Sequence, residues 1–252
     1  MNLKTIILLL VPTLCLSSAI SGEEGKRNTP RAPQDDSTIL DASVIQRGSQ
    51  LTGLENTNDR ENVVPSRTSK NNFINYCYGK ALTNGTKDQG GSCNGIPMGD
   101  IPSFNHMVST LIHRPAPNEI VKANEDLDLT IQINNLATGH FTNTDQSYFS
   151  APQFVNKDGI IEGHVHFTVE YLGPEITPKN GPLDPREPAF FKGVRIAADK
   201  NGILVHRMPA GRLKKKGFYR FCTMTAAANH QPVIMPVARR GSQDDCNKFW
   251  VE

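Results

Sequence analysis

The chain has 252 residues, and its formal net charge of +2 sets 27 Lys and Arg against 25 Asp and Glu. A charge so close to balance gives no global attraction to nucleic acid or anionic membrane, and argues against functions that depend on either. The length suffices for one sizeable β domain with a terminal extension.

The first nineteen residues predict a secretory signal peptide. Lys4 supplies a positive start, residues 6–16 are mostly apolar, and Ser17-Ser18-Ala19 offers small residues for cleavage. The apolar run is too short to span a hydrocarbon layer of about 30 Å. No later run is long enough either, so the sequence predicts export and no transmembrane segment.

Residues 20–70 are predicted to be a disordered leader. They are rich in Ser, Thr, Asn, Asp, Glu, Arg and Gly, show no hydrophobic periodicity and contain few aromatic residues. Such a composition buries too little apolar surface to offset the entropy of ordering. Order is expected to begin near Asn72, so the folded domain is predicted over residues 71–252.

Within this domain the patterns are those of strands. Apolar and polar residues alternate over 126–133 and over 164–171, the period of a half-buried strand. The turn signal Asn201-Gly202 predicts a hairpin over 194–207. Two shorter strands are expected at 218–223 and 233–237, and a turn or two of helix at 105–111. Many short strands separated by Pro and Gly favour a mostly β fold, an antiparallel β-sandwich.

Four of the five cysteines remain once Cys15 is removed with the signal peptide. An even number in an exported chain predicts two disulfides. Three pairings are open, and we favour Cys77–Cys93 with Cys222–Cys246 because each closes a short loop. In a chain-entropy model each bridge contributes about 3 kcal/mol.

Two further surface features are candidate sites. Asn84 opens an Asn-Gly-Thr sequon in a Gly-rich loop and is a candidate for N-glycosylation. Arg212, Lys214, Lys215 and Lys216 form a basic block that can contact a phosphate backbone, an acidic lipid surface or an import receptor, or can be a solvated hairpin tip. No aromatic residues alternate with the basic ones, so nucleic acid is not expected as a partner.

His164 and His166 are the sharpest local signal. Residues i and i+2 of a strand project from one face, about 7 Å apart, and can hold two positions on a zinc or copper ion. His230 or His140 can supply a third ligand. The alternative is a structural or surface role for the pair.

No catalytic motif accompanies these histidines. The sequence lacks a GxSxG elbow, HExxH, a P-loop and a dinucleotide fingerprint. We therefore predict no catalytic residue and no enzymatic activity.

The ordered part resembles an uncharacterised family of small secreted proteins from filamentous fungi and similar microbes. The resemblance is carried by Asn72-Phe73-Ile74-Asn75, Gly163-His164-Val165-His166, Leu183-Asp184-Pro185, Ala189-Phe190-Phe191-Lys192-Gly193, Asn229-His230-Gln231-Pro232-Val233 and Arg240-Gly241-Ser242-Gln243-Asp244-Asp245. It implies a secreted, β-rich domain in an organism living on or in plants.

The leader resembles that of secreted oomycete effectors with an RxLR motif followed by a dEER-like motif. Arg47-Gly48-Ser49-Gln50 stands at a suitable distance from the signal peptide, although Ser49 and Gln50 depart from Leu and Arg. An acidic cluster ending in Asp59-Arg60-Glu61 follows. This resemblance implies delivery into host cells.

Together these features predict a secreted effector of a plant-associated pathogen. It would bind host plant proteins and modulate immunity or cell death, without a resident cofactor or with zinc or copper at the histidines. The alternative is an extracellular metal- or glycan-binding protein of the microbe's own surface. The sequence sets no oligomeric state.

Overall fold

Twelve short elements follow one another in the computed structural model, which describes residues 36–52, 55, 67–87, 89–144, 148–149, 151–178 and 181–252. Thr38–Glu252 form one unit, and of the other, Met1–Ser37, only the last two residues are described. The elements are 3-10 helices η1 (Ala42–Val44), η2 (Arg47–Gln50) and η3 (Phe104–His106), and strands β1 (Ser109–Arg114), β2 (Ile120–Val121), β3 (Leu127–Asn134), β4 (Leu136–Ala137), β5 (Ile161–Gly173), β6 (Phe190–Val194), β7 (Ile203–Met208), β8 (Gly217–Ala227) and β9 (Cys246–Val251).

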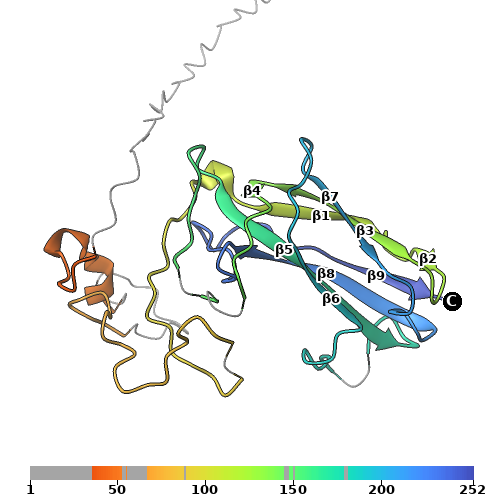
Figure 1. Cartoon of the computed structure of the whole chain (residues 1–252), viewed down its shortest axis with the longest axis horizontal. Coiled ribbons are helices and arrows are strands. Elements are labelled where there is room, and N and C mark those ends of the chain that lie inside the picture. Colours follow the sequence, from red (N-terminus) through yellow and green to blue (C-terminus); the bar gives the residue numbers. More distant parts are fainter. Residues whose placement is uncertain are drawn as a thin grey trace, which may run out of the picture. The chain divides into compact units, whose positions relative to one another are not determined.

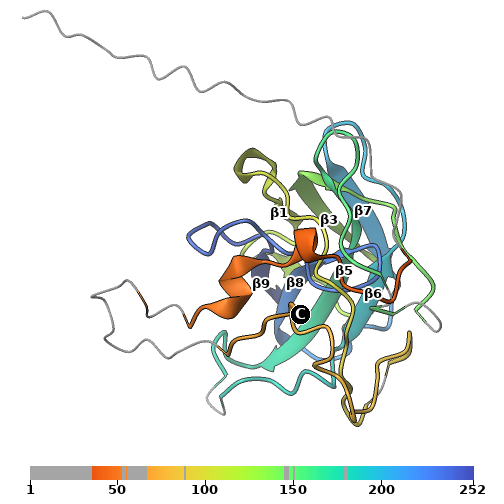
Figure 2. The ribbon, with the colours of Figure 1, turned by 90° about the vertical axis from the view of Figure 1, so that its left-hand side faces the viewer.

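The strands form two sheets, as predicted for a β-sandwich. The smaller has the order β1-β3-β7 and is antiparallel throughout. The larger has the order β2-β9-β8-β5-β4, with β6 also paired to β5, and lies as a second layer against the first (Figure 1). The two layers are also distinct in the view turned by 90°, where β1, β3 and β7 lie on one side and β5, β8 and β9 on the other (Figure 2). The larger sheet also contains two short parallel pairs, β2 with β9 and β4 with β5.

The core lies between the sheets because each long strand alternates. In β3 the buried positions are Leu127, Leu129, Ile131 and Ile133, and the polar residues between them face away from the core. In β5 the core residues Ile161, Val165, Phe167 and Val169 are fully buried. The even-numbered residues of β5 therefore lie on the outer face of the larger sheet.

Two sequence-based expectations were wrong, and a third was right only in part. Residues 194–207 do not form a hairpin, since β6 pairs with β5 of the larger sheet and β7 pairs with β3 of the smaller one. Residues 233–237 form no strand. The helical turn near residue 105 ends at His106, and β1 begins at Ser109 within the segment expected to be helical.

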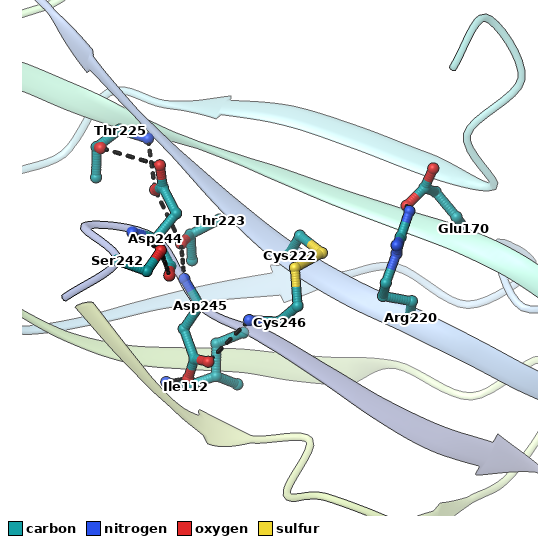
Figure 3. The surroundings of a disulfide bond; sticks show 10 residues. All are labelled: Ile112, Glu170, Arg220, Cys222, Thr223, Thr225, Ser242, Asp244, Asp245 and Cys246. Carbon is teal, nitrogen blue, oxygen red and sulfur yellow. Dashed lines mark hydrogen bonds and ion pairs between the residues drawn. A yellow bond between two sulfur atoms is a disulfide. The ribbon is translucent and has the colours of Figure 1, made fainter. Parts of the chain in front are cut away.

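The structure pairs Cys77 with Cys93 and Cys222 with Cys246, the pairing favoured from loop length. The second bridge joins β8 to β9 on the outer face of the larger sheet, near the ion pair that Arg220 makes with Glu170 across β8 and β5 (Figure 3). No helix among the described residues is long and apolar enough to cross a bilayer.

The acidic pair before β9 ties the two sheets together. Asp245 accepts the N–H of Ile112 in β1 at 2.8 Å and the N–H of Cys246 at 2.8 Å. Asp244 accepts the N–H of Thr225 at 2.8 Å, and burial raises the pKa of its carboxyl. Each carboxyl therefore stabilises the fold through backbone hydrogen bonds.

The predicted signal peptide, residues 1–19, lies outside the described residues, as do Asp59, Arg60 and Glu61. The expectation of a disordered leader over 20–70 also falls largely outside them. Within its described part, Arg47–Gln50 forms η2, and the hydroxyl oxygen of Ser49 lies 2.7 Å from the backbone oxygen of Gln46 and 3.1 Å from that of Ser69, so its one hydrogen can be donated to either.

Candidate metal centre

Three histidines from two segments far apart in sequence meet on the outer face of the larger sheet. His164 and His166 lie two residues apart on β5, and His164 is fully buried while His166 is partly exposed. Their cross-strand partners on β8 are Ala226 and Met224. The sheet therefore presents both imidazoles on one face, as the i, i+2 spacing predicts.

A tight turn after β8 brings His230 to this pair. The N–H of His230 donates to the oxygen of Ala227 at 2.9 Å, and Pro232 returns to pair with Ala226. His230 has a φ of 75°, a left-handed conformation that non-Gly residues adopt mainly where the surroundings impose it. Because Ala226 is also the partner of His164, the turn places His230 beside His164.

The nitrogen atoms of the three rings converge. His164 Nε2 lies 3.3 Å from His166 Nε2 and 3.1 Å from His230 Nδ1. All three candidate ligand atoms lie within 4.8 Å of one another. Four-coordinate Zn²⁺, with Zn–N distances near 2.0–2.1 Å, separates neighbouring nitrogens by about 3.3 Å. Two of the three separations already have this size.

Backbone carbonyls fix the protonation of two rings. The oxygen of His140 lies 2.9 Å from His164 Nδ1, and that of Thr142 lies 2.9 Å from His230 Nε2. A carbonyl oxygen can only accept, so each of these ring nitrogens carries the hydrogen. The lone pairs of His164 Nε2 and His230 Nδ1 then face each other with no hydrogen between them. This is the carbonyl-supported arrangement usual for histidine ligands of metals.

The three rings are held in the neutral form. Burial, followed by the charge that His166 would carry, lowers the pKa of His164 to about 3. Burial also lowers the pKa of His166 and of His230. Neutral imidazole is the form that binds a metal ion, so each lowered pKa favours the form of the ring that can act as a ligand.

Aromatic rings surround the cluster. Phe141 packs against His164 and His230 at centroid distances of 4.5 and 4.7 Å. Tyr148 stacks on His230 at 5.5 Å, and Phe191 stacks on His166 at 5.4 Å.

Gly193 leaves room for this packing. It is the β6 residue paired with His166, and a Cβ there would lie 2.7 Å from the Phe141 ring. The Ala189–Gly193 motif therefore contributes both a ring, Phe191, and the space for a second one.

Positive charge lies close to the centre. The Arg195 guanidinium sits 4.6 Å from the centroid of the Phe141 ring, on which two of the histidines also pack. After burial, the charges of Lys87 and Arg195 further lower the pKa of His230. Among the described residues, no Asp, Glu or Cys joins the three histidines.

The structure brings His164, His166 and His230 together. The side chain of His140, the other third ligand that the sequence offered, does not belong to this cluster. The side chain of His140 is exposed, and its backbone oxygen holds His164. Sequence reasoning missed Phe141, Tyr148, Arg195 and the two supporting carbonyls. The resemblance motif over 189–193 was the one available signal for Phe191 and Gly193.

Two further candidate sites lie outside the three-histidine cluster. Arg212, Lys214, Lys215 and Lys216 are exposed in the loop between β7 and β8, where Leu213 is buried. Asn84 is exposed in a turn closed by a 3.0 Å hydrogen bond from the Thr86 N–H to the Thr83 oxygen.

Comparison with curated proteins finds a fungal relative. The chain is 46% identical over 212 residues to "Pathogenicity cluster 5 protein d" of Colletotrichum graminicola. The match covers 84% of this chain and 43% of the relative, so the chain spans less than half the length of that protein. This relative comes from a fungus, which agrees with the resemblance of residues 71–252 to proteins of filamentous fungi.

Comparison with solved structures finds matches of low sequence identity. Crystal structures of a Listeria innocua β-glucosidase, as a mutant complex with laminaribiose and as a complex with glucose, match 58% and 57% of this chain and 16% of the enzyme. The identity is 10% and the TM-score 0.27, which supports no argument about function.

The family model described as the CLU5d N-terminal domain matches residues 110–252. This range is more than half of the chain and contains β2 to β9 with all three histidines of the cluster. The chain therefore belongs to the CLU5d N-terminal domain family.

Proposed function

We propose that the domain binds one transition-metal ion, zinc or copper, through His164, His166 and His230. The observation that carries this proposal is the pair of facing lone pairs on His164 Nε2 and His230 Nδ1, 3.1 Å apart. Each ring donates its hydrogen to a backbone oxygen, so the two nitrogens cannot hydrogen bond to each other in their neutral forms. A cation between them removes this conflict, and His166 supplies its third ligand.

Metal content is tested with variants that keep each supporting hydrogen bond. An Asn amide at residue 164 can replace the Nδ1–H donor while removing Nε2, and a Gln amide at residue 230 can replace Nε2–H while removing Nδ1. After loading with zinc or copper and gel filtration, the intact chain should retain about one ion. H164N and H230Q should each weaken binding at least about a hundredfold.

The matched control is H113N, because His113 is exposed on β1 of the other sheet. It should retain the metal as the unchanged chain does. Elemental analysis that finds no ion in the loaded protein, or an equal loss in H113N, would contradict the proposal.

We further propose that the chain is an exported effector that acts on the plant host by binding. The relative's name associates it with pathogenicity, and two disulfides suit folding in an oxidising compartment. The signal-like start and the motif at Arg47–Gln50 support export and delivery into host cells. Recognition through a surface, rather than bond chemistry, agrees with the lack of a catalytic motif in the sequence.

Expression in leaves tests this role directly. Residues 20–252, made in leaf cells, are expected to change the extent of cell death or the size of the oxidative burst that defence elicitors trigger. H164N shows whether the histidine centre takes part. A protein that is silent in leaves and stays on the microbial wall would instead support the alternative, a metal- or glycan-binding protein of the microbe's own surface.

A further inference from the structure

We propose that a pocket at one end of the sandwich binds an acidic sugar, a uronic acid within an oligosaccharide, through Arg212, Lys214 and Lys215. The pocket lies where the loop between β7 and β8 meets the last residues of β5 and the first residues of β8. Its volume is about 300 Å³, at the small end of the range for ligand pockets, which suits a single ring and its substituents.

This pocket lies far from the histidine centre. Tyr171 and Tyr219, which line it, are paired across β5 and β8, and Tyr171 follows His164 by seven residues on β5. At about 3.3 Å per residue, the two sites lie about 23 Å apart along the strand. The pocket is therefore a separate site, and its ligand does not depend on the metal-binding function proposed above.

The loop that carries the cations is anchored through its backbone. Leu213 is 2% exposed and belongs to the core. The Tyr219 hydroxyl accepts the N–H of Lys215 at 3.1 Å and donates to the oxygen of the same residue at 3.0 Å. The Tyr171 hydroxyl donates to the oxygen of Lys216 at 3.2 Å. Because the backbone is fixed before a ligand arrives, less conformational entropy is lost on binding.

Positive charge is concentrated at the rim of the pocket. The side chains of Arg212, Lys214 and Lys215 line it and are exposed. Within the described parts of the chain, no ion pair joins any of the three to an acidic residue. The rim can therefore hold an anion through charge-assisted hydrogen bonds, with the planar guanidinium suited to a carboxylate or a phosphate.

Glu187 indicates which anion the pocket suits. Its side chain lines the same pocket as the three cations. A carboxylate repels a phosphate monoester, which carries a charge of about −1.5 to −2 at pH 7, more strongly than it repels a group of charge −1. The same carboxylate accepts hydrogen bonds from hydroxyl groups. The charges therefore favour a ligand with one carboxylate and several hydroxyls over a phosphate.

The rest of the lining fits a sugar ring. Tyr171, Tyr219 and Ala189 add apolar surface to the pocket, on which the C–H face of a ring can pack. A uronic acid combines such a face with hydroxyls and a single carboxylate. Apolar surface, acceptor and cations thus each match one part of this ligand.

Calorimetric titration of residues 20–252 with trigalacturonic acid, in metal-free buffer of low ionic strength, tests the ligand class. The acid should bind at one site. Its fully methyl-esterified form, which keeps the rings and loses the charge, should bind at least about tenfold more weakly. Equal binding of the two forms, or no binding of the acid, overturns the proposal. Binding to vesicles that contain a phosphoinositide, without binding of the acid, overturns it in favour of a phosphate ligand.

Charge variants test the place of binding. R212Q/K214Q should weaken binding of the acid at least about tenfold, because two charge-assisted contacts are lost. The fold should be unaffected, since backbone atoms and Leu213 anchor the loop. Unchanged affinity in this variant overturns the assignment of the pocket.

The matched control is K157Q/K200Q, which removes the same charge. Lys157 and Lys200 are exposed in the turns before β5 and β7, at the opposite ends of these strands from the pocket. An equal loss of affinity in this control would mean that net charge alone attracts the acid, and overturns the pocket. H164N should bind the acid as the unchanged chain does, so this proposal and the metal-binding function fail separately.

Discussion

Without bound metal, the domain should lose about 2 kcal/mol of its free energy of unfolding between pH 7 and pH 5 through His164 alone. The pKa of His164 is lowered from 6.5 to about 3 in the folded protein. Between these two values the unfolded chain takes up a proton that the folded chain does not, so acid favours unfolding. This stabilisation is present above pH 6.5 and is lost as the pH falls below it. His166 and His230 act in the same direction.

Urea unfolding of the metal-free chain at pH 7, 6 and 5 measures this loss. The variant H164N, which keeps the hydrogen bond to the His140 oxygen, should show a shallower dependence on pH, and H113N should follow the unchanged chain. Parallel curves for the unchanged chain and H164N would mean that His164 is not held neutral by the fold.

Replacing Gly163 with Ala should destabilise the domain by about 3 kcal/mol and weaken metal binding at least tenfold. Gly163 is buried in β5, directly before His164. A Cβ at this position would lie 2.1 Å from the oxygen of Ala226 and 3.1 Å from Leu136 Cδ1. The backbone of β8 must move to admit it, and β8 leads into the turn that carries His230.

The control for this prediction is Gly241→Ala. A Cβ at residue 241 meets nothing within 4 Å, and the residue lies in the loop before β9. Stability comes from chemical denaturation and affinity from chelator competition. Equal behaviour of the two variants would show that the close approach of β5 and β8 does not limit the site.

Local alternation was sufficient to predict β3 and β5. β3 buries every second residue, and β5 does so over most of its length, with His164 on its outer face buried as well, so both sequences have the period of two that the sandwich requires. The placement of His164 and His166 on one face of β5 followed from the same rule, whereas the arrival of His230 did not. The favoured disulfide pairing matches the structure because each bridge closes a short loop, of 16 and 24 residues.

Pairing between distant strands could not be predicted in this way. The Asn201-Gly202 turn signal is real, since Gly202 has a φ of 76° and its N–H donates to the Asp199 oxygen. However, a turn signal does not determine which strand each arm pairs with. Val194 pairs with Val165, whereas Ile203 pairs with Gln132. Tertiary packing decides this, and it places the two arms in different sheets.

The surroundings of the site were hidden for a related reason. A backbone oxygen has no residue-specific signature, so the roles of His140 and Thr142 do not follow from their side chains. Phe141 and Arg195 lie far from His230 in sequence and reach it only through the folded sheet.

The two oxygens that hold His164 and His230 come from residues 140 and 142 of one connecting segment. This stretch of three residues therefore fixes the orientation of both imidazoles through its backbone oxygens. A protease cut or an insertion there would release two ligands together while leaving every strand pairing intact. Loading with metal should in turn protect this segment from cleavage, so that proteolysis reports occupancy without any spectroscopic signal.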